Sequence, residues 1–192
     1  YIDKYAFSTC ESLEEVSIPK SVESIGKDAF YRCYNLKEIV VDEENEYYSS
    51  DEYGVLFNKE KTELIAYPAS NEAENYVIPD SVAVIVEGAF RYAKNLAGVT
   101  IPDGIVTLET YVFRECTSLK SVTIPDSVTE IKKYAFYKCT TLSEVKIGNN
   151  VVSIGESAFT FCPIDILVIP DNVKTIGNSA FNDVNEFYIG KN

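Results

Sequence analysis

The stretch from Leu119 to Cys139, LKSVTIPDSVTEIKKYAFYKC, decides the fold of this chain. Its pattern, L-x-x-V-x-I-P-x-x-V-x-x-I-x-x-x-A-F-x-x-C, recurs from one end of the sequence to the other. The phenylalanines at positions 90, 113, 136 and 159 follow one another at steps of 23 residues. A fixed period of this length predicts a solenoid, in which each coil packs only on its neighbours.

Each position of the pattern has a physical role. The alternation in 122–124 predicts a strand with one buried face, and Pro125 ends that strand because proline has no N–H to donate. Val128 and Ile131 should turn back into the core as a second short strand. A helical turn should then carry Ala135 and Phe136 inward.

The strand pattern recurs at eight positions, and one unit is longer than the rest. The step from Val41 to Ile78 is 37 residues instead of 23, and this unit lacks an Ala-Phe pair. Two apolar runs flank the polar residues 58–62, which predicts a β-hairpin within an extended repeat at 42–77. We expect the hairpin to replace the helical turn of that unit and either to protrude from the coil or to widen it. The eight strand positions are Ile18, Val41, Ile78, Ile101, Ile124, Ile147, Ile169 and Ile189.

The repeated IPDSV…I…AF…C pattern resembles the BspA-type leucine-rich repeat family of bacterial cell-surface proteins. The resemblance covers nearly the whole chain, and residues 53–57 and 64–68 look like the wide repeat of that family. It implies an α/β solenoid of about 23 residues per repeat, coiled in a right-handed sense. A parallel sheet would line the concave face, with short strands and helical turns on the other side. The family pattern is a packing pattern, so the resemblance implies no catalytic residue.

Length and composition restrict the class of protein further. The 192 residues suit a single domain, 1–192. The net charge of −13 makes nucleic acid and anionic membranes poor partners, because both need a basic surface. No apolar run is long enough to span a membrane and no signal peptide is present. The sequence opens and stops in the middle of a repeat, so we expect a fragment of a longer protein.

The sequence offers little for catalysis or metal binding. It has no histidine, which excludes Ser-His and Cys-His nucleophiles, and no phosphate- or dinucleotide-binding motif. We therefore expect a protein without enzymatic activity, cofactor or metal. The acidic run at 42–46, with Asp51 and Glu52, leaves two readings open: a calcium site or a solvated loop.

Five cysteines occupy one position of the repeat, where Ala93 and Val184 stand in other units. Cysteines one coil apart have Cα atoms within disulfide range, but parallel side chains keep their Cβ atoms too far apart. We interpret the cysteines as free, buried thiols. They are Cys10, Cys33, Cys116, Cys139 and Cys162.

Two surfaces are candidates for interaction. Tyrosines cluster around the Ala-Phe pairs, where they either cover the turns or form a binding face. The outward strand positions form the other candidate, polar in the middle and apolar at the C-terminal end. That apolar end would bind a partner or be covered by an adjoining segment. The residues of this candidate interaction surface are Ser121, Thr123, Glu144, Lys146, Ile166, Val168, Glu186 and Tyr188.

The function that the resemblance implies is non-enzymatic protein interaction or adhesion. The chain would belong to a secreted or cell-surface bacterial protein, and its partner would be a protein of a host, a matrix or another cell. A structural spacer or stalk within a larger surface protein is the alternative.

Overall fold

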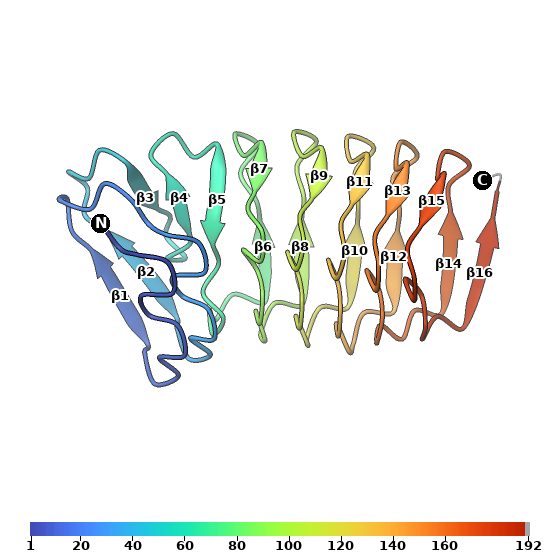
Figure 1. The fold of residues 1–192 in the computed structure, drawn as a ribbon, viewed down its shortest axis with the longest axis horizontal. Coiled ribbons are helices and arrows are strands. Elements are labelled where there is room, and N and C mark those ends of the chain that lie inside the picture. The colour runs from blue at the N-terminus through green and yellow to red at the C-terminus, as the bar shows by residue number, and fades with distance from the viewer. Residues whose placement is uncertain (191–192) are drawn as a thin grey trace.

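The computed structural model describes residues 1–190, which wind into a row of coils stacked along one axis (Figure 1). Eight strands, one per coil, lie side by side along the row. They pair in parallel as β1-β2, as β6-β8-β10-β12 and as β14-β16. These strands are β1 (Glu15–Ile18), β2 (Glu38–Val41), β6 (Asn75–Val77), β8 (Gly98–Thr100), β10 (Ser121–Thr123), β12 (Glu144–Lys146), β14 (Ile166–Ile169) and β16 (Glu186–Ile189).

A second series of strands follows the first in the coils from β2 to β14. Four of them pair in parallel in the order β9-β11-β13-β15. The strand β7 pairs in parallel with β5, at the edge of the sheet β3-β4-β5-β7. Their bounds are β3 (Tyr48–Ser50), β4 (Leu56–Asn58), β5 (Glu63–Ala66), β7 (Val84–Ile85), β9 (Thr107–Leu108), β11 (Glu130–Ile131), β13 (Ser153–Ile154) and β15 (Thr175–Ile176).

The strands are short because the sequence limits them on both sides. In β10 the side chain of Val122 is buried between exposed Ser121 and Thr123, which is the alternation of a sheet with one solvent face. Pro125 follows one residue after the buried Ile124 and cannot donate a ladder hydrogen bond. Equivalent residues of successive repeats lie directly opposite one another in the sheet: Ser121 of β10 pairs with Glu144 of β12, and Thr123 pairs with Lys146.

The side of the coil that carries the Ala-Phe pair contains no helix among residues 1–190, so the expected α/β class and helical turns are wrong. Successive turns take their place, as in Cys116 N to Phe113 O at 3.3 Å. Two residues per turn have left-handed backbone, for example Tyr111 at φ 61° and Glu115 at φ 60°. A helix cannot continue through such residues, because helical φ is negative. Alternate amides instead donate to the next coil, as Phe113 N does to Ala135 O at 2.8 Å.

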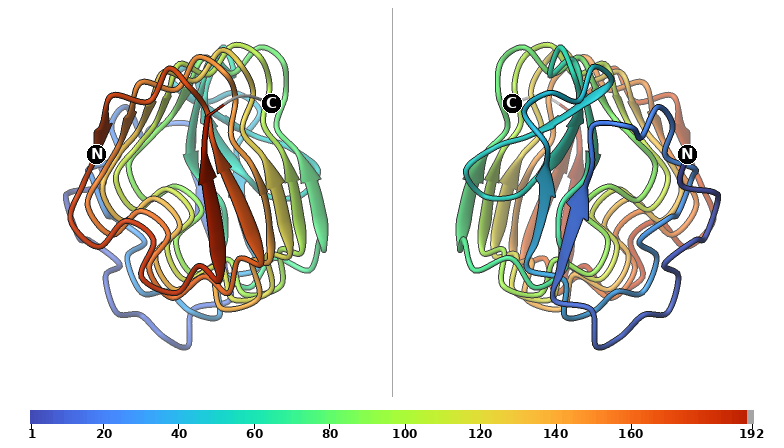
Figure 2. Two further views of the ribbon diagram at one scale, coloured as in Figure 1. Left: turned by 90° about the vertical axis from the view of Figure 1, so that its right-hand side faces the viewer. Right: turned by 90° about the vertical axis from the view of Figure 1, so that its left-hand side faces the viewer.

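The coils enclose one interior along the axis of the stack (Figure 2). Apolar side chains fill this interior. Phenyl rings stack from coil to coil with centroids 4.9 Å apart for Phe90 and Phe113 and 5.2 Å apart for Phe113 and Phe136. A coil of this size exposes one of its apolar faces on its own, so stacking is what buries the core. The buried side chains form two clusters, and the smaller one, at the N-terminal end, extends from Val16 to Leu56.

The cysteines are free, as expected, and four of the five are buried. Cys10 is exposed, so the expectation of burial is wrong for this thiol. Each buried thiol donates a hydrogen bond to a phenylalanine carbonyl of the preceding coil, such as Cys139 Sγ to Phe113 O at 3.1 Å. A thiol can therefore fill this small apolar position while also pairing a carbonyl oxygen.

The long repeat lacks an Ala-Phe pair but keeps an inward ring. Ala66 and Tyr67 hold that place, 23 residues before Phe90, and the Tyr67 ring stacks on Phe90 at 4.9 Å. Tyr67 N donates to Ala89 O at 2.8 Å, the same bond that Phe113 N makes to Ala135 O. The antiparallel strands β3, β4 and β5 precede this position. The inward ring is kept, whereas the two left-handed residues of a regular turn are missing at Ile65 and Ala69.

Candidate interaction surfaces

The sheet face carries the residues that the sequence singled out. Seven of the eight have exposed side chains, and Val168 is partly buried. Ile166 is 56% exposed and Tyr188 is 57% exposed, so the apolar character of the C-terminal end is on the surface. The register places Ile166 beside Glu186 and Val168 beside Tyr188.

A shallow groove of about 620 Å³ follows the middle of this face across β6, β8, β10 and β12. Ser121, Thr123 and Lys146 line it, together with Val77 and Thr100. The other five predicted residues lie outside the groove. Gly98 and the threonines keep side chains small here, which leaves room for a partner to approach the sheet.

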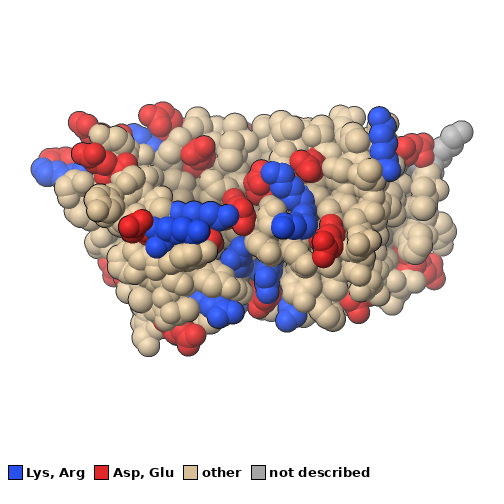
Figure 3. Space-filling view, viewed as in Figure 1, with Lys and Arg blue, Asp and Glu red and all other residues tan. Residues whose placement is uncertain are grey.

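A second feature, which the sequence indicated only through its tyrosines, is a partly buried stripe of alternating aromatic and cationic side chains. It lies on the side of the coils that carries the Ala-Phe turns, here called the turn side. The Arg91 guanidinium lies 5.1 Å from the Tyr31 ring and 4.5 Å from the Tyr111 ring. Arg114 stands in the same way between Tyr111 and Tyr137, at 5.4 and 5.2 Å. Such cation–π contacts fix the long side chains along the axis. Lys and Arg side chains also form a band across the middle of the face in Figure 3.

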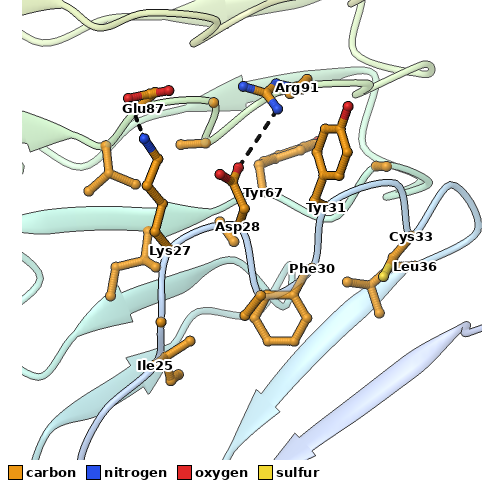
Figure 4. Close-up of a pocket in the computed structure, with 18 of the residues that line it drawn as sticks. Ile25, Lys27, Asp28, Phe30, Tyr31, Cys33, Leu36, Tyr67, Glu87 and Arg91 are labelled. Carbon is orange, nitrogen blue, oxygen red and sulfur yellow. Dashed lines mark hydrogen bonds and ion pairs between the residues drawn. The ribbon is translucent and has the colours of Figure 1, made fainter. Parts of the chain in front are cut away.

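The third feature is a cleft of about 500 Å³ at the long repeat (Figure 4). One wall is the Phe30 turn (residues 27–32), and the other is the Phe90 turn (residues 87–92). The floor is formed by Ile65, Ala66 and Tyr67, with Leu36 beside it. No sequence signal pointed to this cleft, because the residues of its two walls lie 60 positions apart.

Ion pairs bridge the two walls above the cleft. Lys27 Nζ lies 2.8 Å from Glu87 Oε2, and Arg91 lies 3.7 Å from Asp28 Oδ1. The hydrogen bond that Lys27 donates to Glu87 raises the pKa of Lys27, although this lysine is largely exposed. Arg91 is mostly buried, and its Nε has no hydrogen-bond partner among the described residues. Burial raises the pKa of the Cys33 thiol at the edge of the cleft to about 11.

The acidic run of the long repeat does not converge on one point. Asp42 caps its own turn by accepting from Glu44 N at 2.9 Å, and Glu44 pairs with Lys20. Asp51 accepts from Tyr76 Oη at 2.6 Å. Within residues 1–190 no three Asp, Glu, Cys or His residues form a group that could hold a metal ion. The same residues contain no helix long and apolar enough to cross a membrane.

Solved structures with the same fold come from bacteria. A leucine rich cell surface protein of Faecalibacterium prausnitzii is 29% identical, with a TM-score of 0.68 over 92% of this chain and 50% of its own. A leucine-rich repeat protein of Eubacterium ventriosum is 25% identical, with a TM-score of 0.58 over 91% of this chain and 59% of its own. The pneumococcal vaccine antigen PcpA, 23% identical with a TM-score of 0.67, shares the fold over 94% of this chain and 56% of its own.

This chain therefore spans only 50% to 59% of the length of these three structures. A comparison with curated proteins gave no match. The sequence model of the BspA type leucine rich repeat region matches six copies, over residues 1–71 and 60–187. The chain belongs to the BspA-type leucine-rich repeat family.

Proposed function

We propose that this chain is a non-enzymatic protein-binding module of a secreted or cell-surface bacterial protein, acting in adhesion. The groove on the sheet face is the observation that supports the proposal most directly. It extends over four adjacent strands and is lined by small and polar side chains such as Ser121 and Thr123. Extended surfaces of this kind are what solenoids use for binding.

The names of two similar structures support the cellular location. One is a cell surface protein and another is a vaccine antigen of pneumococcus. A chain that covers about half of such proteins fits a segment of a longer surface protein, in which other parts would supply export and anchoring. The proposed partner is a protein on a host cell, in a matrix or on another bacterium.

A matched pair of substitutions tests the sheet face. The purified chain would be applied to arrays of host-surface and matrix proteins, and the binding constant measured for each partner found. Thr123→Arg places a long cation in the groove and should weaken binding by about tenfold or more, which corresponds to about 1.4 kcal/mol. Thr117→Arg makes the same change at an exposed threonine outside the groove and should leave binding unchanged.

The outcomes separate the proposal from its rival. Equal losses for both variants would contradict the assignment to the sheet face. A folded chain that finds no partner would favour a spacer that holds other domains away from the cell.

A further inference from the structure

The hydrogen bonding between coils follows one rule on the turn side. In each regular turn that another coil follows, three alternate amides donate to oxygen atoms of that next coil. The acceptors are carbonyl oxygens, except that Phe161 N donates to Asp183 Oδ2. Phe90 N donates to Val112 O and Tyr92 N donates to Arg114 O, both at 2.9 Å. Gly88 N completes the set with a bond of 3.0 Å to the next coil. Each turn therefore presents three donors in a row toward its C-terminal neighbour.

This rule fails at the Phe30 turn. Among residues 1–190, the amides of Asp28, Phe30 and Arg32 donate to no acceptor, although they hold the positions of Gly88, Phe90 and Tyr92. By analogy with the regular turns, these N–H groups face the cleft. The Phe30 ring stacks on Phe7 at 5.7 Å on one side, and no described ring stacks on its other side. These N–H groups lie along the cleft without a protein acceptor, so this wall can receive the acceptors of an incoming chain.

The opposite wall has unpaired acceptors. In the regular coils, Lys133 O and Tyr137 O accept bonds from the preceding turn. The equivalent atoms in the Phe90 turn, Glu87 O and Arg91 O, accept no bond from a described residue. The buried Arg91 Nε lies at the same wall without a partner.

The cause is the path of the chain at the long repeat. Strand β5 runs on to Ala66, and neither Ile65 nor Ala69 has the left-handed backbone that bends the regular turns outward. Residues 65–69 therefore run straight between the Phe30 turn and the Phe90 turn, which both project outward. The backbones of these two turns are therefore separated by the width of one additional polypeptide segment. Side chains cross part of this gap, such as Lys27 to Glu87 and Tyr31 to Tyr92.

We propose that this cleft binds an extended peptide segment of a partner protein. The segment takes the place of the missing turn between the Phe30 turn and the Phe90 turn. The peptide backbone would accept bonds from the amides of the Phe30 turn and donate to the carbonyls of the Phe90 turn. One aromatic or large aliphatic side chain would fill the apolar space beside Phe30, Leu36 and Ile65. The volume of about 500 Å³ lies in the range of binding pockets.

The chemistry of the two walls selects a peptide over an anion. A carboxylate or phosphate would satisfy the donors but would leave the carbonyls unpaired and would meet Asp28 and Glu87. The Lys27–Glu87 pair that spans the cleft is partly exposed, and such pairs contribute little, so an incoming chain can displace it. This site lies on the turn side and is independent of the sheet groove proposed above.

The chain itself supplies a probe peptide. Residues 133–138, KYAFYK, form the turn that occupies the equivalent space in a regular coil. The test is amide hydrogen exchange by NMR on the intact chain, with and without this peptide in capped form at millimolar concentration. The amides of Asp28, Phe30 and Arg32 should exchange fast in the free protein and at least about tenfold more slowly with the peptide. Those of Gly88, Phe90 and Tyr92 are the matched controls, because they are already bonded within the protein.

Changes in the peptide and in the protein define the remaining outcomes. The peptide KYAGYK, which lacks the ring, should protect the three amides much less. Ala66→Leu fills the floor of the cleft and should weaken binding by about tenfold, whereas Thr123→Arg on the sheet should not alter it. The proposal is overturned if the three amides are already slow in the free protein, if KYAFYK gives no protection, or if benzoate protects as well as the peptide.

Discussion

At the scale of single residues, the turn side depends on backbone that ordinary side chains disfavour. Tyr134 at φ 59° and Lys138 at φ 60° are left-handed, and Gly88 holds the position of Tyr134 two turns earlier at φ 70°. Each such residue costs about 1–2 kcal/mol for an L-amino acid. The hydrogen bonds between coils and the cation–π contacts of the stripe offset that cost, which is why tyrosine is tolerated where glycine would be expected.

Substitution of Gly88 measures this backbone cost. Gly88→Ala should lower the free energy of unfolding by about 1–2 kcal/mol in urea titrations, because alanine disfavours positive φ. Gly88→Asn is the control and should cost less, since asparagine tolerates left-handed backbone better. Equal losses for the two variants would mean that the contact of the new Cβ with Arg91 dominates instead.

The buried thiols make stability depend on alkaline pH. Burial raises the pKa of Cys139 and of Cys162 well above the ordinary value of 9.0. The unfolded chain then loses these protons near pH 9 while the folded chain keeps them. The thiol contribution is complete below pH 9 and declines as pH rises toward the folded pKa, by up to about 1.4 kcal/mol per pH unit for each thiol.

Cys139→Ala tests this assignment. The variant should show a shallower fall of unfolding free energy between about pH 9 and pH 10, where the unfolded thiol titrates. The measurement is a series of urea titrations at fixed pH, and Cys10→Ala is the control because Cys10 is exposed. An unchanged slope in Cys139→Ala would show that other groups cause the alkaline loss.

At the scale of elements, the ring position of the long repeat explains how the insertion is tolerated. Tyr67 is 4% exposed and stacks on Phe90. The row of stacked rings therefore continues from the long repeat into the coil that follows it. Its hydroxyl makes only long hydrogen bonds, at 3.3 Å to Asn71 Oδ1 and 3.3 Å to Ala73 O. The ring therefore contributes more than the hydroxyl.

Two substitutions at this position separate the contributions. Tyr67→Phe should change the unfolding free energy by no more than about 1 kcal/mol, because a typical hydrogen bond adds about that much. Tyr67→Ala should cost about 3–5 kcal/mol, as for a large aromatic residue removed from a core. Thermal and urea unfolding would measure both, and a large loss in Tyr67→Phe would contradict the view that Tyr67 replaces a phenylalanine of the row.

The sequence predicts much of the fold because its signals are local and repeated. The alternation at 122–124 and Pro125 set the length of a strand, and the 23-residue step sets the stacking. The turn conformation could not be predicted, because the sequence Tyr-Ala-Phe is compatible with a helix. Only the hydrogen bonds from its amides to the next coil fix the turn. The cleft was equally hidden, since it arises from the path of Ile65–Ala69 between two distant turns.

At the scale of the whole molecule, charge and shape act together. The net charge of −13 is spread along a row of coils with few compensating ion pairs among the described residues. Self-repulsion of this kind lowers the stability of a folded chain. It also favours partners or surfaces of positive charge at long range.

Salt should therefore stabilise the protein. Raising NaCl from about 0.01 M to 0.15 M shortens the screening length from about 30 Å to about 8 Å. The midpoint of thermal unfolding at pH 7 should rise, and the effect should vanish near the isoelectric point of 4.4, where the net charge is small. A midpoint that falls with salt at pH 7 would show that ion pairs outweigh the repulsion.

Stacking of equivalent residues along one axis is the claim on which the binding surfaces depend. Electron paramagnetic resonance distances test it most directly, in a Cys10→Ala background with one spin label at Glu15. The second label would be placed in turn at Ser121, Glu144, Ile166 and Glu186, which are exposed and occupy equivalent places in successive strands. The mean distance should increase by about 4.8 Å with each strand passed. Distances that stay level or decrease along this series would contradict the account.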